Sequence, residues 1–340
     1  MSTEEDTGDG VEETSKLLSA TPTTAGVAVT KPASVNDMDH GTDYISPEEV
    51  PWGEILGAAA VWALGFSKFG FYYSFFLVVT WLPSYLHEMG MEQSLAAYMS
   101  AVPFAVTVPF VILFGVLAHT MMHRGVSKAV TRKFLATTCF TANIGCFYAL
   151  TTIPVGKPWA GFTAVVIMYA FNASFIAGVA VNVIDIGAKY AGSIMALTHI
   201  FATGAGFLSS VITGALVTKR GHYERAFMVA VGVNVVSLVC FLFFAKFEPI
   251  FEVEESKRDT KMSKEVTEFS KQSVWKYWPR RWNIMLFCFM ADLICYMDRA
   301  NISATMIPMA KKYGWSKKFE GVCFGVFFLG LMSSHLVGGY

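Results

Sequence analysis

The chain has 340 residues, of which 54% are hydrophobic and 15% carry a charge, with 26 basic and 26 acidic side chains. This composition is typical of a protein that crosses a membrane several times, and it argues against a soluble globular domain. The sequence holds no phosphate-binding glycine loop, nucleophile elbow or metal-binding cluster, so we expect no enzyme activity, no cofactor and no metal. Nucleic-acid binding is not expected either, because no concentrated basic face is present.

Negative charge is concentrated at the start of the chain. Residues 1–50 contain eleven acidic residues and two lysines, which gives this segment a net charge of −9. Such a segment cannot bury enough apolar surface to offset the entropy lost on ordering, so we predict a disordered acidic tail. Within it, the stretch 13–18 (Glu-Thr-Ser-Lys-Leu-Leu) fits the acidic dileucine pattern that vesicle adaptors read. A sorting signal and a plain tail are both compatible with this pattern.

Eight apolar runs follow the tail, and each is close to the roughly 20 residues that a membrane-spanning helix needs. We therefore predict an all-α polytopic membrane protein with about eight transmembrane helices. Residues 51–247 would form a six-helix bundle, 248–281 a charged cytoplasmic linker, and 282–340 two further helices. The runs are 55–82, 95–121, 134–153, 159–181, 191–217, 226–245, 282–310 and 319–340.

The distribution of Lys and Arg predicts the orientation. With the N-terminus in the cytoplasm, the cytoplasmic loops hold 14 of these residues and the opposite loops hold 8, which favours that orientation. We expect the protein in the plasma membrane or in an endolysosomal or vacuolar membrane. Within the linker, residues 262–278 place apolar side chains on one helical face. Both an interfacial helix on the cytoplasmic leaflet and a solvated linker fit this pattern.

The seventh run carries an unusual polar face. Asp292, Tyr296, Arg299 and Ser303 step by four, three and four residues, so they lie on one side of a helix, and Asp298 is adjacent to them. A charge near the membrane centre costs at least ~2.5 kcal/mol, so this face must meet protein or a water-filled cavity. We assign Arg299 and Tyr296 to substrate binding, and Asp292 and Asp298 to coupling or gating. The alternative is an Asp–Arg pair that only holds helices together.

Lys68 lies midway along the first run, and Tyr72 follows it by one helical turn. A lysine at this depth is costly unless it meets an anion, a carboxylate or a water-filled cavity. Its side chain is too short to reach the membrane surface, which lies about 20 Å away at ~1.5 Å per helical residue. We therefore predict that Lys68 and Tyr72 bind substrate.

Three further residues are candidates for coupling or gating. His199 in the fifth run can titrate near neutral pH, which suits proton coupling, although a hydrogen bond to a neighbouring helix is the alternative. Asp185 and Lys189 fall between the fourth and fifth runs, where we expect them to pair and to brace a gate. Asparagines within the runs are expected to join helices by hydrogen bonds. They are Asn143, Asn172, Asn182 and Asn234.

The end of the chain resembles a known family. The run Tyr296-Met-Asp-Arg-Ala-Asn-Ile-Ser303, followed by Ile307-Pro-Met and Tyr313-Gly-Trp-Ser316, resembles the first transmembrane helix of the anion:cation symporters. These belong to the major facilitator superfamily and include sialin, the vesicular glutamate transporters and the sodium–phosphate cotransporters. Phe327-Phe-Leu-Gly330 and Val337-Gly-Gly-Tyr340 are similar to the family's second helix.

The earlier part of the chain resembles the second half of the same family, its helices seven to twelve. Thr80-Trp-Leu-Pro-Ser-Tyr85 is similar to the end of helix seven. Gly115-Val-Leu-Ala118 with Arg124-Gly and Arg132-Lys133 is similar to the loop between helices eight and nine. The stretch 182–192, Asn-Val-Ile-Asp-Ile-Gly-Ala-Lys-Tyr-Ala-Gly, is similar to the turn between helices ten and eleven.

The order of these pieces departs from the family, because the second half of a transporter precedes the first two helices of another. Helices three to six have no counterpart in the sequence. Two fused transporter genes or a misplaced gene boundary would each produce this order. The resemblance implies that substrate binds near the membrane midplane, with Arg299 from one part and Lys68, Tyr72 and His199 from the other.

We therefore expect a secondary active transporter of inorganic phosphate or a small organic anion, coupled to H⁺ or Na⁺ and working by alternating access. Its partners would be the anion, the coupling ion, the lipid bilayer and a second transporter chain. The alternative is a transport-incompetent fragment or fused gene product that acts as a structural or regulatory partner of a full-length relative. Anion uptake that depends on Arg299 and Lys68 would separate the two.

Overall fold

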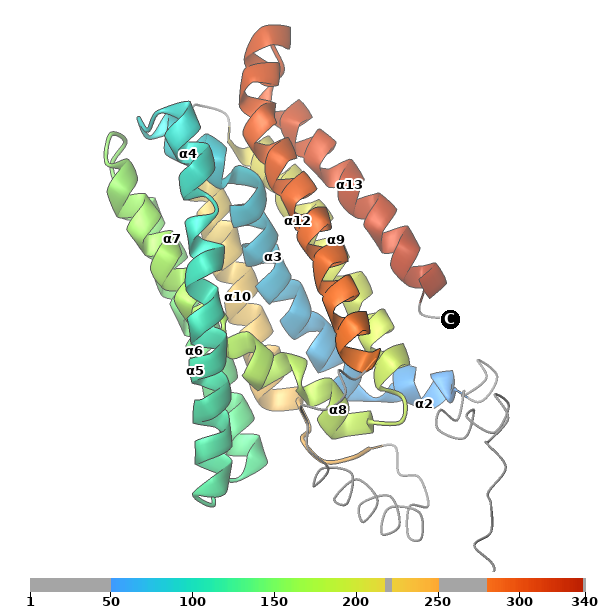
Figure 1. Cartoon of the computed structure of the whole chain (residues 1–340). Coiled ribbons are helices and arrows are strands. Elements are labelled where there is room, and N and C mark those ends of the chain that lie inside the picture. Colours follow the sequence, from blue (N-terminus) through green and yellow to red (C-terminus); the bar gives the residue numbers. More distant parts are fainter. Residues whose placement is uncertain (1–49, 218–221, 251–279, 339–340) are drawn as a thin grey trace, which may run out of the picture. The chain divides into compact units, whose positions relative to one another are not determined.

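The computed structural model describes the backbone of residues 50–217, 222–250 and 280–338 (Figure 1). Side chains are described in these ranges except at most positions from 280 to 300 and at 334–338. The acidic tail with its dileucine pattern and the linker segment 262–278 lie outside the described residues. What we expect of them stays a prediction.

Every described element is a helix, and each of the eight apolar runs corresponds to one or two of them. Within the described residues, six spans are long and apolar enough to cross a membrane: α3, α4 with α5, α6, α7 to α8, α9 and α10. The expected all-α, multi-pass membrane fold is therefore confirmed, and α12 and α13 cover the seventh and eighth runs. The helices are α2 (Trp52–Gly57), α3 (Ala59–Glu88), α4 (Gln93–Met99), α5 (Val102–His123), α6 (Lys128–Thr152), α7 (Pro158–Asn172), η3 (Ile176–Ala180), α8 (Asn182–Gly187), α9 (Ala191–Leu216), α10 (Glu224–Phe244), α12 (Arg280–Tyr313) and α13 (Lys317–Gly338).

The turn between α5 and α6 shows how local sequence ends one span and starts the next. Gly125 has a φ of +85°, in the left-handed region that only glycine adopts without strain, and it directly follows the last turn of α5. Ser127 then caps α6, because its hydroxyl accepts a hydrogen bond from the backbone N–H of Val130. So short a connection leaves the two helices neighbours in the bundle.

The fourth span is not one regular α-helix, because the π-helical turn η3 separates α7 from α8. Here the span packs closely on α6: a Cβ added to Gly178 would lie 2.8 Å from the backbone nitrogen of Ala136. The Ser174 hydroxyl also donates a hydrogen bond to the Leu135 carbonyl, at 3.0 Å. A π-turn leaves backbone carbonyls available to side chains. The Ala177 carbonyl accepts such a hydrogen bond from the guanidinium of Arg132.

Helix α3 packs against α9 and α10 and is the most deeply buried span (Figure 1). Polar side chains join it and its neighbours. The Asn234 amide donates to the Ser74 hydroxyl at 2.6 Å, and the Asn143 amide donates to the Asn172 side-chain oxygen at 2.8 Å. Three of the four asparagines thus join helices as expected. Asn182 differs, because its buried amide has no hydrogen-bond partner within the described residues.

Helices α12 and α13 pack on the bundle, α12 along α3 and α13 along α9 (Figure 1). Glycine allows the second contact: a Cβ on Gly321 would lie 2.6 Å from the Ser210 carbonyl oxygen and 3.0 Å from the Cα of Gly214. The two backbones therefore touch where these glycines face each other. The described residues beyond 50 form one compact unit. The expected division of this unit near residue 247 stays a prediction.

Candidate functional site

Lys68 is fully buried between α3 and α9, with 1% of its surface exposed. Its ammonium donates a hydrogen bond to the Thr198 hydroxyl at 2.7 Å and lies 3.0 Å from the sulfur of Met195. Among the described side chains it forms no ion pair. Burying a cation costs several kcal/mol unless an opposite charge or several hydrogen bonds compensate. Two neutral contacts compensate only in part, so this position favours an anion nearby.

Tyr72 and His199 lie in the same part of the bundle as Lys68, since His199 directly follows Thr198, the hydrogen-bond partner of Lys68. The binding role of Tyr72 stays a prediction. Tyr72 follows Lys68 by one turn of α3, and its ring centroid lies 6.3 Å from that of His199 on α9. The Nδ1 atom of His199 lies 2.9 Å from the Met195 carbonyl oxygen, so Nδ1 carries the hydrogen of this bond. The histidine thus bonds to its own helix, and the expected alternative of a bond to a neighbouring helix stays a prediction. Its coupling role stays a prediction.

An aromatic cavity of about 290 Å³, lined in part by Tyr72, lies between α3, α5, α7 and η3. One wall is a stacked pair, Phe71 and Phe175, with ring centroids 3.7 Å apart. Another is anchored by the Tyr169 hydroxyl, which donates to the Phe75 carbonyl at 3.2 Å. The cavity therefore offers a large apolar surface one helical turn from a buried ammonium. Its aromatic lining consists of Phe71, Tyr72, Phe75, Phe104, Tyr169 and Phe175.

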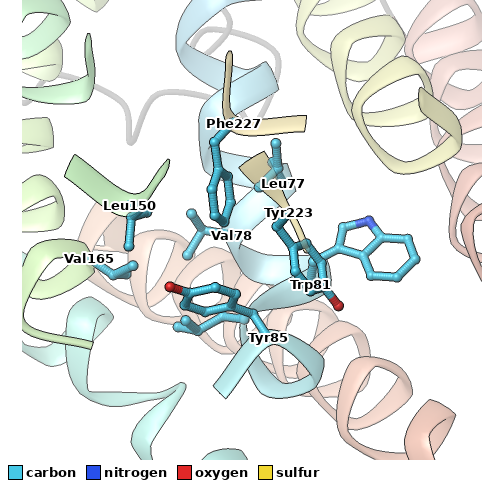
Figure 2. Close-up of a pocket in the computed structure, with 9 residues that line it drawn as sticks. Leu77, Val78, Trp81, Tyr85, Leu150, Val165, Tyr223 and Phe227 are labelled. Atoms are coloured by element: carbon cyan, nitrogen blue, oxygen red, sulfur yellow. The ribbon is translucent and has the colours of Figure 1, made fainter. Parts of the chain in front are cut away.

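A second space inside the bundle is too small for a substrate. Figure 2 shows it between Leu77, Trp81 and Tyr85 of α3 and Tyr223 and Phe227 near the start of α10. Its volume is about 10 Å³, which is room for about one water molecule. The rings of Tyr85 and Tyr223 meet edge to face at 5.4 Å.

Asp185 pairs with different residues from the one that the sequence suggested. It lies in α8, and its carboxylate accepts from the Arg132 Nε at 3.0 Å and lies 3.4 Å from the Lys128 Nζ. Lys189 is exposed, with its ammonium 5.2 Å from the ring of Tyr190, and the expected Asp185–Lys189 pair is not formed. The correction follows from helix geometry, since α8 turns Asp185 toward the start of α6.

The polar face of the seventh run lies only partly within the described side chains. Helix α12 includes all its members, and Ser303 is buried with 2% of its surface exposed. The side chains of the other four residues lie outside the described ones, so their roles stay predictions. They are Asp292, Tyr296, Asp298 and Arg299.

The sequence reasoning missed two charged clusters. Arg132 was counted only as a loop residue, although Ser127 as a helix cap would have placed it in α6, on the same face as Lys128. The second cluster joins α3 to α13, where Lys317 lies 2.8 Å from Glu88 and 3.0 Å from Glu320. No local signal predicts this contact, because 229 residues separate Glu88 from Lys317 in the sequence.

Comparison with known proteins settles the family. The sequence profile of the Major Facilitator Superfamily matches residues 133–340. The chain belongs to the Major Facilitator Superfamily. The match covers the later helices of the bundle together with α12 and α13, which carry the resemblance to the anion:cation symporters.

The curated relatives include proteins named as anion transporters and sialin, in keeping with the resemblance to the anion:cation symporters. "Probable anion transporter 5" of Arabidopsis thaliana is 31% identical over 217 residues, which is 60% of this chain and 49% of that protein. "Probable anion transporter 6" of Oryza sativa subsp. japonica is 28% identical over 218 residues, covering 60% and 50%. Sialin of Ovis aries is 28% identical over 223 residues, covering 60% and 42%. The chain thus spans about half the length of the curated relatives it matches.

Proposed function

We propose that this membrane protein takes part in secondary active transport of a small anion, by alternating access and driven by H⁺ or Na⁺. The observation that supports this most is Lys68, a fully buried ammonium whose described partners are all neutral. A buried cation of this kind attracts an anion with little competition from water. Relatives named as anion transporters point the same way.

Lys68 would bind the charge of the anion, and Tyr72 and His199 would line its approach. The aromatic cavity beyond Tyr72 would accept an apolar part of the substrate, which favours a small organic anion over inorganic phosphate. Arg299 of α12 would complete the binding site, as the resemblance to the family implies. We also propose the orientation with the N-terminus in the cytoplasm, on the distribution of basic residues.

In this mechanism two charged clusters would hold opposite ends of the transport path. Arg132 and Asp185 join α6 to α8 at one end of the bundle, and Lys317 joins α13 to α3 at the other. Alternating access requires that one end opens while the other stays closed. Charge pairs between helices suit that task, because water can replace them when the helices separate.

The test is uptake by the full chain reconstituted in liposomes, with inorganic phosphate and benzoate as separate probes. Lys68→Met keeps the volume of the side chain and removes its charge, so we expect uptake to fall at least about tenfold, which corresponds to ~1.4 kcal/mol. Lys157→Met, in an exposed turn, is the matched control and should behave like the parent protein. Unchanged uptake by Lys68→Met would show that Lys68 does not bind the substrate.

The alternative is a structural or regulatory partner of a full-length relative, without transport of its own. In that case reconstituted chains would show no uptake of either probe. The chain would instead co-purify with a full-length relative, and Lys68→Met would leave that association unchanged.

A further inference from the structure

Asn172, the last residue of α7, carries a buried amide in the wall of the aromatic cavity. Its side chain lines the cavity and is 4% exposed. The Oδ1 atom accepts a hydrogen bond from the Nδ2 of Asn143 on α6, at 2.8 Å, and lies 3.5 Å from the sulfur of Cys139. The Nδ2 atom of Asn172 has no hydrogen-bond partner among the described residues. One arm of this amide thus binds α6, and the other is a buried donor without an acceptor.

The neighbouring contacts fix which arm of the amide is left over. Besides its bond to Asn172, the Nδ2 of Asn143 donates to the backbone carbonyl of Cys139 at 3.2 Å. A carbonyl oxygen can only accept, so Asn143 must present its NH₂ group on this side. Asn172 therefore meets that group with its oxygen, and its own NH₂ group remains unpaired. An amide NH₂ group only donates, so the missing partner is a hydrogen-bond acceptor.

Other polar side chains in the wall are already bonded. The Thr107 hydroxyl donates to the Pro103 carbonyl at 2.9 Å, and the Tyr169 hydroxyl donates to the Phe75 carbonyl, as described above. A buried donor without a partner is uncommon in a folded protein, because its loss of solvation is not repaid. The NH₂ group of Asn172 is therefore available to a ligand that brings an oxygen into the cavity.

The walls of the cavity favour a flat ring as the body of that ligand. The ring of Phe104 meets those of Phe75 and Tyr169 edge to face, with centroids 5.9 and 5.2 Å away. Aromatic side chains arranged in this way pack well against a further ring. An apolar cavity of ~150 Å³ is enough to hold benzene. The observed volume of about 290 Å³ therefore has room for a benzene ring with a substituent.

We propose that Asn172 is a specificity-determining residue, which donates a hydrogen bond to an acceptor oxygen on an aromatic ring bound in the aromatic cavity. The substrate class is then an aromatic carboxylate, or a similar aromatic anion, whose ring carries a carbonyl or ether oxygen. The inference rests on the proposed function for the binding of the anionic group. It deepens that function by naming the part of the substrate that the cavity selects.

The hydrogen bond has a quantitative consequence. A ligand with an oxygen at the right position satisfies the Asn172 donor, whereas an analogue with a CH₂ group there leaves the donor buried and unpaired. We expect the oxygen compound to bind about tenfold more tightly, which corresponds to ~1.4 kcal/mol. If Asn172 only joined α7 to α6, its replacement would change the affinity for both compounds equally. The ratio of the two affinities therefore separates selection of the ligand from support of the fold.

The experiment is displacement of tritiated benzoate from the purified full chain in detergent. The competitors are acetylbenzoate and isopropenylbenzoate, each as the meta and the para isomer. At a given position the two differ only by an oxygen in place of a CH₂ group. Both carry the same carboxylate, so the contribution of Lys68 cancels in the ratio. We expect acetylbenzoate to bind about tenfold more tightly in at least one position, and the two to bind within about twofold in Asn172→Leu.

Asn234→Leu is the matched control. It makes the same substitution at a buried asparagine that also joins two helices, through its bond to Ser74, but does not line this cavity. Its affinity ratio should equal that of the parent protein. If Asn172→Leu fails to fold, Asn172→Ala removes the same amide with a smaller side chain and takes its place.

Equal affinities for the two compounds at both ring positions in the parent, or a parental ratio in the Asn172 variant, would overturn the inference. Benzoate uptake that depends on Lys68, together with equal affinities, would refute the role of Asn172 and leave the proposed function intact. A tenfold ratio without uptake would support Asn172 as a binding residue and refute transport by this chain. If benzoate does not bind to the parent at all, both the inference and the proposed binding of organic anions fail.

Discussion

Arg132→Met is the substitution whose cost the structure defines best. The Arg132 side chain is 8% exposed and donates to the Asp185 carboxylate and to the Ala177 carbonyl in η3. Removing it leaves a carboxylate that is 11% exposed with one partner among the described side chains, Lys128, which is 47% exposed and 3.4 Å away. Breaking a buried pair costs ~3–5 kcal/mol, and the exposed lysine recovers at most ~1 kcal/mol. We therefore expect a loss of about 3 kcal/mol, or roughly 6–12 °C in the thermal midpoint.

The assay is thermal unfolding of the purified chain in detergent, followed by tryptophan fluorescence at one scan rate. Lys128→Met is the control, since it removes the exposed half of the same cluster and should cost less than about 1 kcal/mol. The double variant Arg132→Met with Asp185→Asn should recover part of the loss, because it leaves no buried charge without a partner. Equal midpoints for Arg132→Met and Lys128→Met would refute the reasoning.

Two further substitutions test the packing of α13 and the buried end of the bundle. Gly321→Val places side-chain atoms against the α9 backbone and should cost about 1–3 kcal/mol in thermal unfolding, whereas Gly330→Val meets open space and should cost little. Burial, together with the Glu88 and Glu320 carboxylates, raises the pKa of Tyr223 well above its usual range. The unfolded tyrosine ionises near pH 10 while the folded one stays neutral, so the stability of the parent should fall as pH rises above about 10. Tyr223→Phe should flatten that fall between pH 8 and 11, and an identical pH dependence would contradict the assigned shift.

Part of the candidate site could be read from the sequence because the membrane makes local patterns informative. Lys68 is a charged residue in an apolar run, which makes it easy to recognise, and Tyr72 lies one helical turn later on the same face. Its pairing with Thr198 could not be read in this way, because 130 residues separate the two side chains. Asp185 shows most clearly which contacts cannot be predicted from the sequence. Proximity in the sequence suggested Lys189, whereas the packing of η3 on α6 brings Asp185 of the following helix α8 to Arg132 and Lys128.

The sequence by itself determined the apolar spans, their approximate ends and the family, since hydropathy and motifs are local properties of the chain. Only the tertiary structure decided which charges meet. The Glu88–Lys317–Glu320 cluster exists because Gly214 and Gly321 let α13 lie directly on α9, which brings the start of α13 to the end of α3. Contacts of this kind depend on how closely two backbones approach, and that distance is set by side chains far apart in the sequence.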